Sequence, residues 1–227
     1  MGGQACVLYG AAEFSRDTDI VILAEEDNLA RLTDALERLE AKLIAVPELS
    51  IDMLKRGHAV HFRCQHPDVA GIRLDVMSVL RGIDPFDILW KRRTTVETKD
   101  NELIDLLSLT DLVTSKKTQR DKDWPMLRRL VEAHAAKYKD HPETLQIEFW
   151  LKEARTPELL VHVARRFPEC AQKLLIHRPL LKAAMDGNIP LLQKKLDAEE
   201  KNERERDRNY WRPLRKELEQ LRRSRHN

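Results

Sequence analysis

The sequence predicts an α+β protein, in which a small mixed β-sheet is backed by helices and followed by an all-helical C-terminal region. Two short segments, residues 17–23 and 72–80, alternate apolar and polar residues with period two, which is typical of strands. Leucines recur at helical spacing between them, and helical patterns dominate beyond about residue 101. Strand, helix and strand in this order, followed by helices, favour the α+β class.

The first predicted strand carries two acids on one side. In residues 17–23 (DTDIVIL), Asp17 and Asp19 point the same way, while Ile20 and Ile22 face the opposite, apolar side. Two carboxylates this close repel each other, so their most stable state at neutral pH has a divalent cation between them. The alternative interpretation is a solvated strand end.

A helix and a second strand are expected next. Asp27 or Asn28 would cap the helix, which should cover one face of the sheet. Its leucines recur at helical spacing, at Leu29, Leu32, Leu36, Leu39 and Leu43. Residues 58–64 then predict a strand antiparallel to the one that follows. His58 and His61 face opposite sides of it, so we do not expect them to share a metal ion.

A third acid lies on the strand predicted at residues 72–80 (IRLDVMSVL). Leu74 and Val76 face one side of this strand and Asp75 the other. Three aspartates on two strands match two-metal phosphoryl chemistry, in which one ion activates the attacking hydroxyl and the other binds the triphosphate and the leaving pyrophosphate. Mg²⁺ is the expected ion because it prefers hard oxygen ligands, and Mn²⁺ is the alternative. Taken alone, Asp75 also fits a chance surface acid.

The combination of Gly2-Gly3, then Asp17-x-Asp19 followed by apolar residues, and a later strand bearing Asp75 resembles the nucleotidyltransferase superfamily. This superfamily includes DNA polymerase beta and the bacterial minimal and toxin-type nucleotidyltransferases. The resemblance implies that the three aspartates are the catalytic and metal-binding residues for two Mg²⁺ ions. It also implies that Gly2 and Gly3 open a helix whose amides contact phosphate.

Two further features bear on this resemblance. Ser15, just ahead of the acids, matches the family's pattern and is counted with the nucleotide-binding residues. The family places an apolar strand before the glycine pair, whereas only Met1 precedes it here. We therefore expect the first strand of the sheet to be missing or truncated.

Residues 109–123 (LTDLVTSKKTQRDKD) resemble the basic segment that follows the catalytic core in many bacterial members. The functional interpretation is that Lys117, Arg120 or Lys122 binds the nucleotide and neutralises its triphosphate. The structural interpretation is a charged helix surface, on which Lys122 and Asp123 form exposed ion pairs of little energetic value.

Three regions are predicted along the chain: a nucleotidyltransferase core over 1–100, a helical extension with the basic segment over 101–140, and a helical C-terminal domain over 141–227. Within them, residues 102–109 fit neither period, whereas 121–138 predict an amphipathic helix.

The last ninety residues predict further helices. Thr156-Pro157 predicts the start of a helix that runs to Arg166 and is stopped by Pro168, and Gly187 predicts another helix end. Residues 194–208 alternate acids and bases, which indicates a solvated or partner-bridging helix. An apolar stripe from Tyr210 onward then fits either a helix docked on the helical domain or a contact with RNA or a partner.

Composition limits the remaining classes. The chain has 227 residues and 42% hydrophobic content, enough for a core, and its formal net charge of +2 does not indicate a nucleic-acid partner. The sequence has no run of about twenty apolar residues and no secretory pattern, so we expect a cytoplasmic protein without membrane contact. Three scattered cysteines predict reduced thiols, neither a disulfide framework nor a zinc site.

The leading hypothesis is therefore an enzyme that transfers a nucleoside monophosphate from a nucleoside triphosphate (NTP) to an acceptor hydroxyl. The resemblance implies RNA, protein or a small molecule as the acceptor, and a toxin-antitoxin or abortive-infection role with a cognate antitoxin protein as partner. One alternative is a catalytically impaired nucleotidyltransferase scaffold that binds nucleotide or a partner. A third is an RNA-binding helical protein in which the acids are incidental.

Overall fold

The computed structural model describes residues 1–225 and has the predicted α+β class. The chain groups into two compact units. Unit 1 comprises Met1–Ser115 together with the chain from Asn209 onward, and unit 2 comprises Lys116–Arg208. The division into three consecutive regions stays a prediction, and the two units are described separately below.

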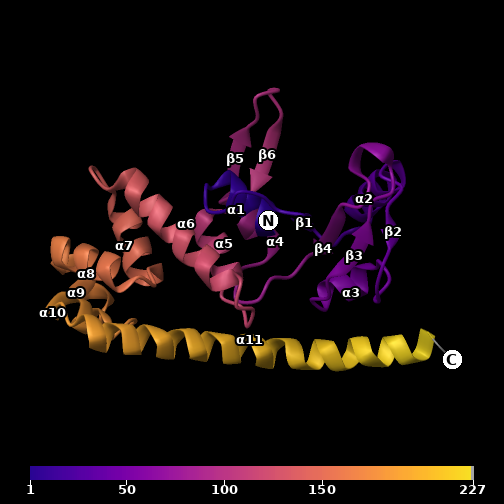
Figure 1. Ribbon diagram of the computed structural model, residues 1–227. Helices are drawn as coiled ribbons and strands as arrows, with labels where there is room; N and C mark the ends of the chain where they lie inside the picture. Colours follow the sequence, from indigo (N-terminus) through magenta and orange to yellow (C-terminus); the bar gives the residue numbers. More distant parts are fainter. Residues whose placement is uncertain (226–227) are drawn as a thin grey trace. The chain divides into compact units, whose positions relative to one another are not determined.

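Unit 1 holds every strand of the described chain, with short helices between the strands. In chain order its elements are α1 (Gly2–Leu8), β1 (Asp17–Val21), α2 (Glu26–Arg38), β2 (Lys42–Leu43), α3 (Ile51–Lys55), β3 (Val60–Arg63), the 3₁₀ turn η1 (Pro67–Val69), β4 (Arg73–Met77), α4 (Phe86–Lys91), β5 (Thr94–Glu97), β6 (Leu103–Leu106) and α5 (Leu109–Ser115). Figure 1 shows α2 and α3 beside the larger sheet.

The larger sheet is mixed, as predicted. Its strand order is β1-β4-β3-β2, with β1 parallel to β4 and the other two pairs antiparallel. The two strands that carry the predicted acids are therefore direct neighbours, although more than fifty residues separate them in the sequence. The predicted antiparallel pairing of β3 with β4 is also confirmed.

One face of this sheet is the core of unit 1. Val60 and Val76 are fully buried there, with Phe62 and Leu74 beside them. Burying side chains of this size contributes about 1.5–3 kcal/mol each to folding. Because neighbouring residues of a strand face opposite sides, this burial turns every second residue of β1, β3 and β4 toward the other face.

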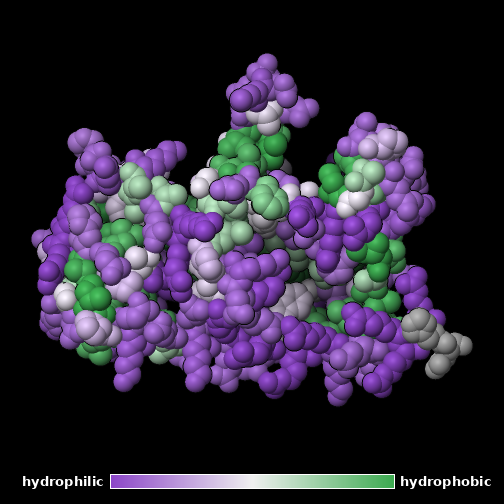
Figure 2. Space-filling model, in the orientation of Figure 1, coloured by the Kyte–Doolittle hydropathy of each residue, from purple (hydrophilic) through white to green (hydrophobic). Residues whose placement is uncertain are grey.

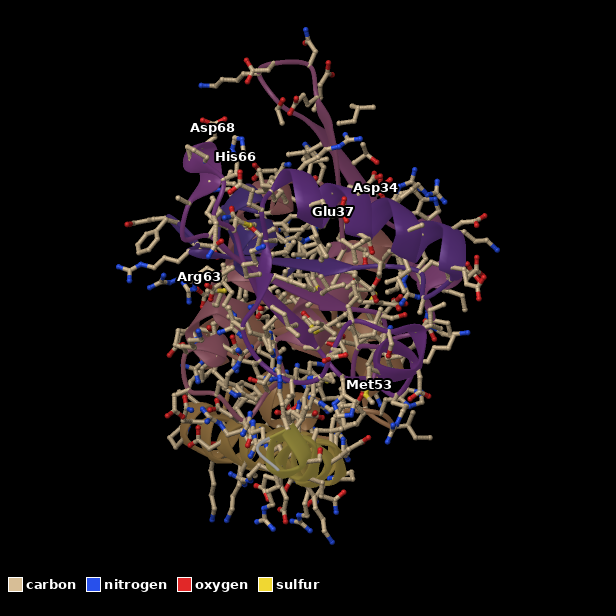
Figure 3. All side chains as sticks on the ribbon, turned by 90° about the vertical axis from the view of Figure 1, so that its right-hand side faces the viewer. Asp34, Glu37, Met53, Arg63, His66 and Asp68 are labelled. Atoms are coloured by element: carbon tan, nitrogen blue, oxygen red, sulfur yellow. The ribbon has the colours of Figure 1, made fainter. Side chains whose placement is uncertain are left out.

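Helix α2 covers the apolar face, as predicted, but its ends differ from the prediction. Leu36 is buried, and the other leucines of its inner side pack against the same core. Its N-cap is Glu25, two residues before Asp27, the first of the two predicted caps. The helix ends at Arg38, so Leu43 does not belong to it and lies in β2. The exposed acids Asp34 and Glu37 lie on its solvent side (Figure 3).

The ambiguous segment at residues 102–109 contains a strand. β6 (Leu103–Leu106) pairs antiparallel with β5 (Thr94–Glu97), so the chain is not yet helical at residue 101. The pattern fitted neither period because three of the four residues of β6 are exposed and only Leu106 is buried, so burial imposes no alternation on this strand. Leu103 and Ile104 are 72% and 37% exposed, and apolar surface is visible along this hairpin (Figure 2).

Unit 2 is all-helical. It contains α6 (Asp123–Tyr138), α7 (Thr144–Glu153), α8 (Pro157–Arg166), α9 (Pro168–Leu174), α10 (Leu181–Asp186) and the first part of α11 (Ile189–Arg225). The predicted helix starts at Thr156-Pro157 and after Gly187 are confirmed, and Gly187 has the left-handed conformation typical of a helix end. Helix α8 ends at Arg166, as predicted, and Pro168 then occupies the first turn of α9, where a missing N–H costs nothing.

The C-terminal part of α11 belongs to unit 1, so the docked helix contacts the strand-containing unit and not the helical domain on which the sequence predicts it to dock. The Tyr210 hydroxyl and Leu214 lie against Gly57, which has a φ of +93°. Glu217 Oε2 lies 2.9 Å from Nε2 of the buried His58, and the same carboxylate pairs with Arg56.

The prediction that His58 has a structural role, apart from His61, agrees with this contact. Across residues 1–225, the helices are too short or too polar to cross a membrane.

Candidate active site

The second face of the larger sheet is polar, and the three predicted acids lie on it. Asp19 on β1 is the register partner of Asp75 on β4, and Asp75 is in turn the partner of His61 on β3. Paired residues of neighbouring strands point to the same face, and the strands lie about 4.8 Å apart. Asp17, two residues before Asp19, shares this face and pairs in register with Arg73. The structure thus brings the three acids to adjacent positions.

Asp75 is the most enclosed of these residues, with 9% of its surface exposed. Arg73 Nε donates to Asp75 Oδ1 at 2.7 Å. His61 Nδ1 lies 2.8 Å from the same oxygen and 3.1 Å from Arg73 Nη2. Because a carboxylate only accepts, His61 must carry its proton on Nδ1 to bond Asp75, and the short approach to Arg73 is then a contact between two donors.

These contacts keep Asp75 ionised. Burial alone would raise the pKa of this carboxyl, but the hydrogen bonds and positive charges of His61 and Arg73 outweigh it, so the pKa of Asp75 lies below its ordinary value. The hydrogen bond to Asp75 raises the pKa of Arg73, and the charges of Asp17 and Asp19 add to this effect. A carboxyl with a lowered pKa is a weak base, so the arrangement favours binding and orientation over proton abstraction by Asp75.

Gly2 and Gly3 lie directly against the acid strand, at the start of α1. A Cβ atom at Gly2 would overlap the carboxylate of Asp19, and one at Gly3 would overlap the hydroxyl of Ser15. Gly2 also has a φ of +68°, which favours glycine. Close approach therefore leaves no space for a side chain at either glycine. A phosphate-binding role for this turn stays a prediction.

Ser15 connects this turn to the acid strand. Its Oγ donates to the carbonyl of Asp17 at 2.9 Å, and Gln4 Nε2 donates to the Ser15 carbonyl at 3.1 Å. The amino group of Met1 donates to the carbonyl of Asp19 at 2.7 Å. The start of α1 is thus tied to β1 by hydrogen bonds as well as by packing.

His61 and Arg73 are the site residues that the sequence did not assign. The sequence leaves open whether His61 faces Asp75, and it does not single out Arg73. For Arg73 the available signal was its spacing, two residues before Asp75 on the same strand. Strand pairing was needed to show that they meet at one oxygen.

The basic residues of the predicted segment lie in unit 2, where Lys117 and Arg120 form ion pairs. Lys117 Nζ lies 2.7 Å from Glu153 Oε2, and Arg120 Nε lies 2.8 Å from Asp123 Oδ2. Asp123 is 1% exposed and also accepts from the Thr118 hydroxyl at 2.5 Å, so it is a buried acid that contacts both Arg120 and Thr118. Lys122 is exposed and immediately precedes α6. A triphosphate role for Lys117, Arg120 and Lys122 stays a prediction.

The oxygen chemistry of the three acids suits Mg²⁺, because all three side chains are carboxylates on one face. Within residues 1–225, however, no three His, Cys, Asp or Glu side chains already converge as a metal-binding group. Oδ1 of Asp75 is engaged by Arg73 and His61. Ion binding would therefore use the remaining oxygens of this carboxylate and of its neighbours.

No family model matches the chain. No curated protein matches it either.

Proposed function

We propose that this chain is a Mg²⁺-dependent nucleotidyltransferase that moves a nucleoside monophosphate from an NTP to an acceptor hydroxyl. The observation that supports it best is the pairing of Asp19 with Asp75 across adjacent strands, with Asp17 on the same face. A glycine turn that leaves no space for a side chain lies against the carboxylate of Asp19 and the hydroxyl of Ser15. Acids beside a bare backbone turn suit a phosphorylated substrate with its cation.

In this proposal Asp17, Asp19 and Asp75 hold two Mg²⁺ ions, with Mn²⁺ as a substitute. The ions would neutralise the triphosphate and make the acceptor hydroxyl more acidic. Gly2 and Gly3 let the backbone approach the phosphates, and Ser15 holds the turn against the acid strand.

Arg73 and His61 keep the carboxylate of Asp75 ionised and in one orientation. Partners of this kind around metal ligands typically change metal affinity or activity by about 10- to 100-fold.

The test is transfer of label from NTPs that carry it in the α-phosphate, because this phosphate stays with the transferred nucleotide. Purified protein is incubated with each of the four NTPs, Mg²⁺ and either total RNA or lysate protein. We expect one acceptor class to become labelled. The Asp17→Ala/Asp19→Ala variant should lose this labelling by about 100-fold or more, because carboxylate ligands of the ions are removed.

The matched control is Asp34→Ala/Glu37→Ala, which removes two exposed acids of α2 on its solvent side (Figure 3). It should label as the unaltered protein does, and circular dichroism should show that both variants are folded. Equal labelling by the active-site variant and this control would falsify the enzymatic proposal. A role as a toxin with a cognate antitoxin rests on this activity and would be tested next, by expression in the presence and absence of neighbouring genes.

The second candidate is a binding module built on the same scaffold. The observation that favours it is the ion pair between Arg73 and Asp75, because this pair neutralises the third acid without a metal ion. Titration calorimetry combined with a pyrophosphate assay distinguishes the two proposals. Mg²⁺-dependent binding of ATP without pyrophosphate release, with any acceptor, supports the binding module, whereas release supports the enzyme.

A further inference from the structure

A cavity of about 370 Å³ lies in unit 2, between α6 and α8, with Trp150 of α7 in its wall. It is separate from the acids, the glycines and the basic segment discussed above. Its size is within the range of small-molecule sites, which are typically 300–1,000 Å³ and mostly apolar with a few polar groups.

Two contacts hold α6 and α8 together, one near each end of the cavity. At one end the hydroxyl of Thr156 donates to Glu132 of α6. At the other end Arg166 Nη1 donates to the carbonyl of Lys139 at 2.7 Å. The side chains of α6 between these contacts include Ala135, which leaves the space open. The cavity is thus a preformed feature of the helix arrangement, bounded at both ends.

The interior wall of the cavity is apolar. Trp150 and Val163 are 2% exposed, and Leu159 lines the wall beside them. The indole nitrogen of Trp150 donates to Nδ1 of His134 at 2.9 Å, so its polar atom is already satisfied and its ring needs no polar ligand. An apolar group that enters from water would gain about 25 cal/mol for each Å² it buries.

The mouth of the cavity is cationic at one end. Lys139 and Arg166 are exposed lining residues that lie together at the end of α6 and α8, and His162 lies one turn before Arg166. Glu132, the acid of the lining, is at the opposite end and is engaged by Thr156. An apolar wall with two permanent positive charges at one mouth complements a ligand that is apolar with one anionic end.

We propose that this cavity binds a small amphipathic carboxylate, with its hydrocarbon body against Trp150 and Val163 and its carboxylate between Lys139 and Arg166. The site is independent of the proposed nucleotidyl transfer, because its lining residues belong to α6, α7, α8 and the chain next to them.

The test compares three probes with the same ten-carbon chain, measured by titration calorimetry on the full-length protein below their micelle concentrations. Decanoate should bind one molecule per chain, about tenfold more tightly than decan-1-ol, which is the ratio expected from one charge-assisted contact worth 1.4 kcal/mol. Decyltrimethylammonium should bind more weakly than decan-1-ol because the mouth repels it. Equal affinity for the three probes, or no saturable binding of decanoate, would overturn the proposal.

Variants then locate the binding. Ala136→Phe places a ring in the cavity from the exposed side of its wall and should lower decanoate affinity at least tenfold. Lys139→Gln should lower decanoate affinity several-fold and leave decan-1-ol affinity unchanged. The matched control is Arg129→Gln, an exposed cation of the same helix outside the lining, which should change neither.

The proposal can still be tested if one of these variants does not fold. Lys139 is exposed, and Arg166 bonds its backbone carbonyl, which a glutamine retains, so Lys139→Gln tests the site even if Ala136→Phe unfolds. If Lys139→Gln and Arg129→Gln changed decanoate affinity equally, the attraction would be a general charge effect and the proposed site would be wrong.

Discussion

Asp75 is the residue on which the candidate site depends most. It shares one face with Asp19, and it is held by Arg73 and His61 through a single oxygen. Such a carboxylate cannot change rotamer without breaking a charge-assisted hydrogen bond, which is about twice as strong as a neutral one. We infer that the sheet supplies an acid of defined orientation, as a metal-dependent site requires.

Replacing Arg73 tests this orientation. In Arg73→Gln the guanidinium is lost, so Asp75 keeps only the contact with His61, and we expect labelling activity to fall about 10- to 100-fold. Arg63→Gln is the matched control, because Arg63 pairs in register with Arg73 and is exposed, with its guanidinium on the carbonyl of Gly71. Initial rates at saturating NTP, together with thermal unfolding, are the measurement. Equal loss in both variants would contradict the assigned role.

Gly2 offers a second test at the same scale. Gly2→Ala places a methyl group on the Asp19 carboxylate at a φ of +68°, so the carboxylate must move and activity should fall by at least tenfold. Gly10→Ala is its control, because Gly10 has a similar φ of +77° and an added Cβ there meets no atom within 4 Å. Backbone strain should lower the free energy of unfolding of both variants by about 1–2 kcal/mol. Retained activity in Gly2→Ala would show that the close approach has no function.

At the scale of elements, α11 has one end in each unit. In unit 1 its residue Glu217 is the partner of both Arg56 and the buried His58. In unit 2 its residue Glu199 bonds Arg178, at 3.1 Å to Nε and 2.8 Å to Nη2. Pro213 lies inside the helix near the first of these contacts. The alternating charges of this helix are therefore only partly a solvated surface, because particular acids neutralise buried bases.

The contact of α11 with unit 1 predicts an unequal effect of two neighbouring acids. Glu217→Ala leaves the buried His58 without its partner and should lower the free energy of unfolding by about 2–3 kcal/mol. Glu219→Ala removes an exposed acid two residues away and should change the free energy of unfolding by no more than about 0.5 kcal/mol. Urea unfolding monitored by circular dichroism measures both. Similar values for the two variants would show that the helix end does not stabilise the unit.

The contact in unit 2 predicts a pH dependence. Burial raises the pKa of Glu199, but the hydrogen bond and charge of Arg178 and the charges of Arg155 and Lys117 outweigh it, so the folded-state pKa lies below the unfolded value. A group with a depressed pKa contributes stability that is present above its unfolded pKa, about 4.3, and is lost as the pH falls through the folded pKa. Between pH 7 and pH 3 the unfolding temperature should therefore fall less in Glu199→Gln than in the unaltered protein. An equal fall of the unfolding temperature in both proteins would contradict this account.

At the scale of the whole molecule, charges are numerous but nearly balanced. The chain has 40 basic and 38 acidic residues, and many bases are engaged by acids within each unit. The hydroxyl of Tyr210, which the sequence offers as a stacking residue for RNA, lies against Gly57 in unit 1. The nearly balanced charge does not indicate an RNA partner, and RNA binding stays an alternative to be tested.

This balance predicts a weak salt dependence. The affinity for total RNA, measured by fluorescence anisotropy, should change less than about tenfold between 50 and 200 mM salt. The affinity of a protein that makes 6–10 phosphate contacts falls by a factor of about 10³–10⁵ over that range. A loss of this larger size, insensitive to Asp17→Ala/Asp19→Ala, would favour the RNA-binding alternative over nucleotidyl transfer.

Local pattern was sufficient for much of the fold. Alternation placed Ile20, Leu74 and Val76 on the core face and Asp19 and Asp75 on the other, because period two follows from strand geometry alone. Helix starts at Thr156 and ends at Gly187 were predictable because capping depends on neighbours in the chain. The hairpin at residues 94–106 was not, because its pairing depends on a partner strand outside the segment.

The sequence by itself determined the α+β class, the three aspartates on strands and the glycine pair ahead of them, because propensity and period act over a few residues. Only the tertiary structure decided that Asp19 and Asp75 are neighbours, that Arg73 and His61 meet at one oxygen, and that α6 and α8 enclose a cavity. These relations join residues far apart in the chain, so strand register and helix packing create them and no local pattern encodes them.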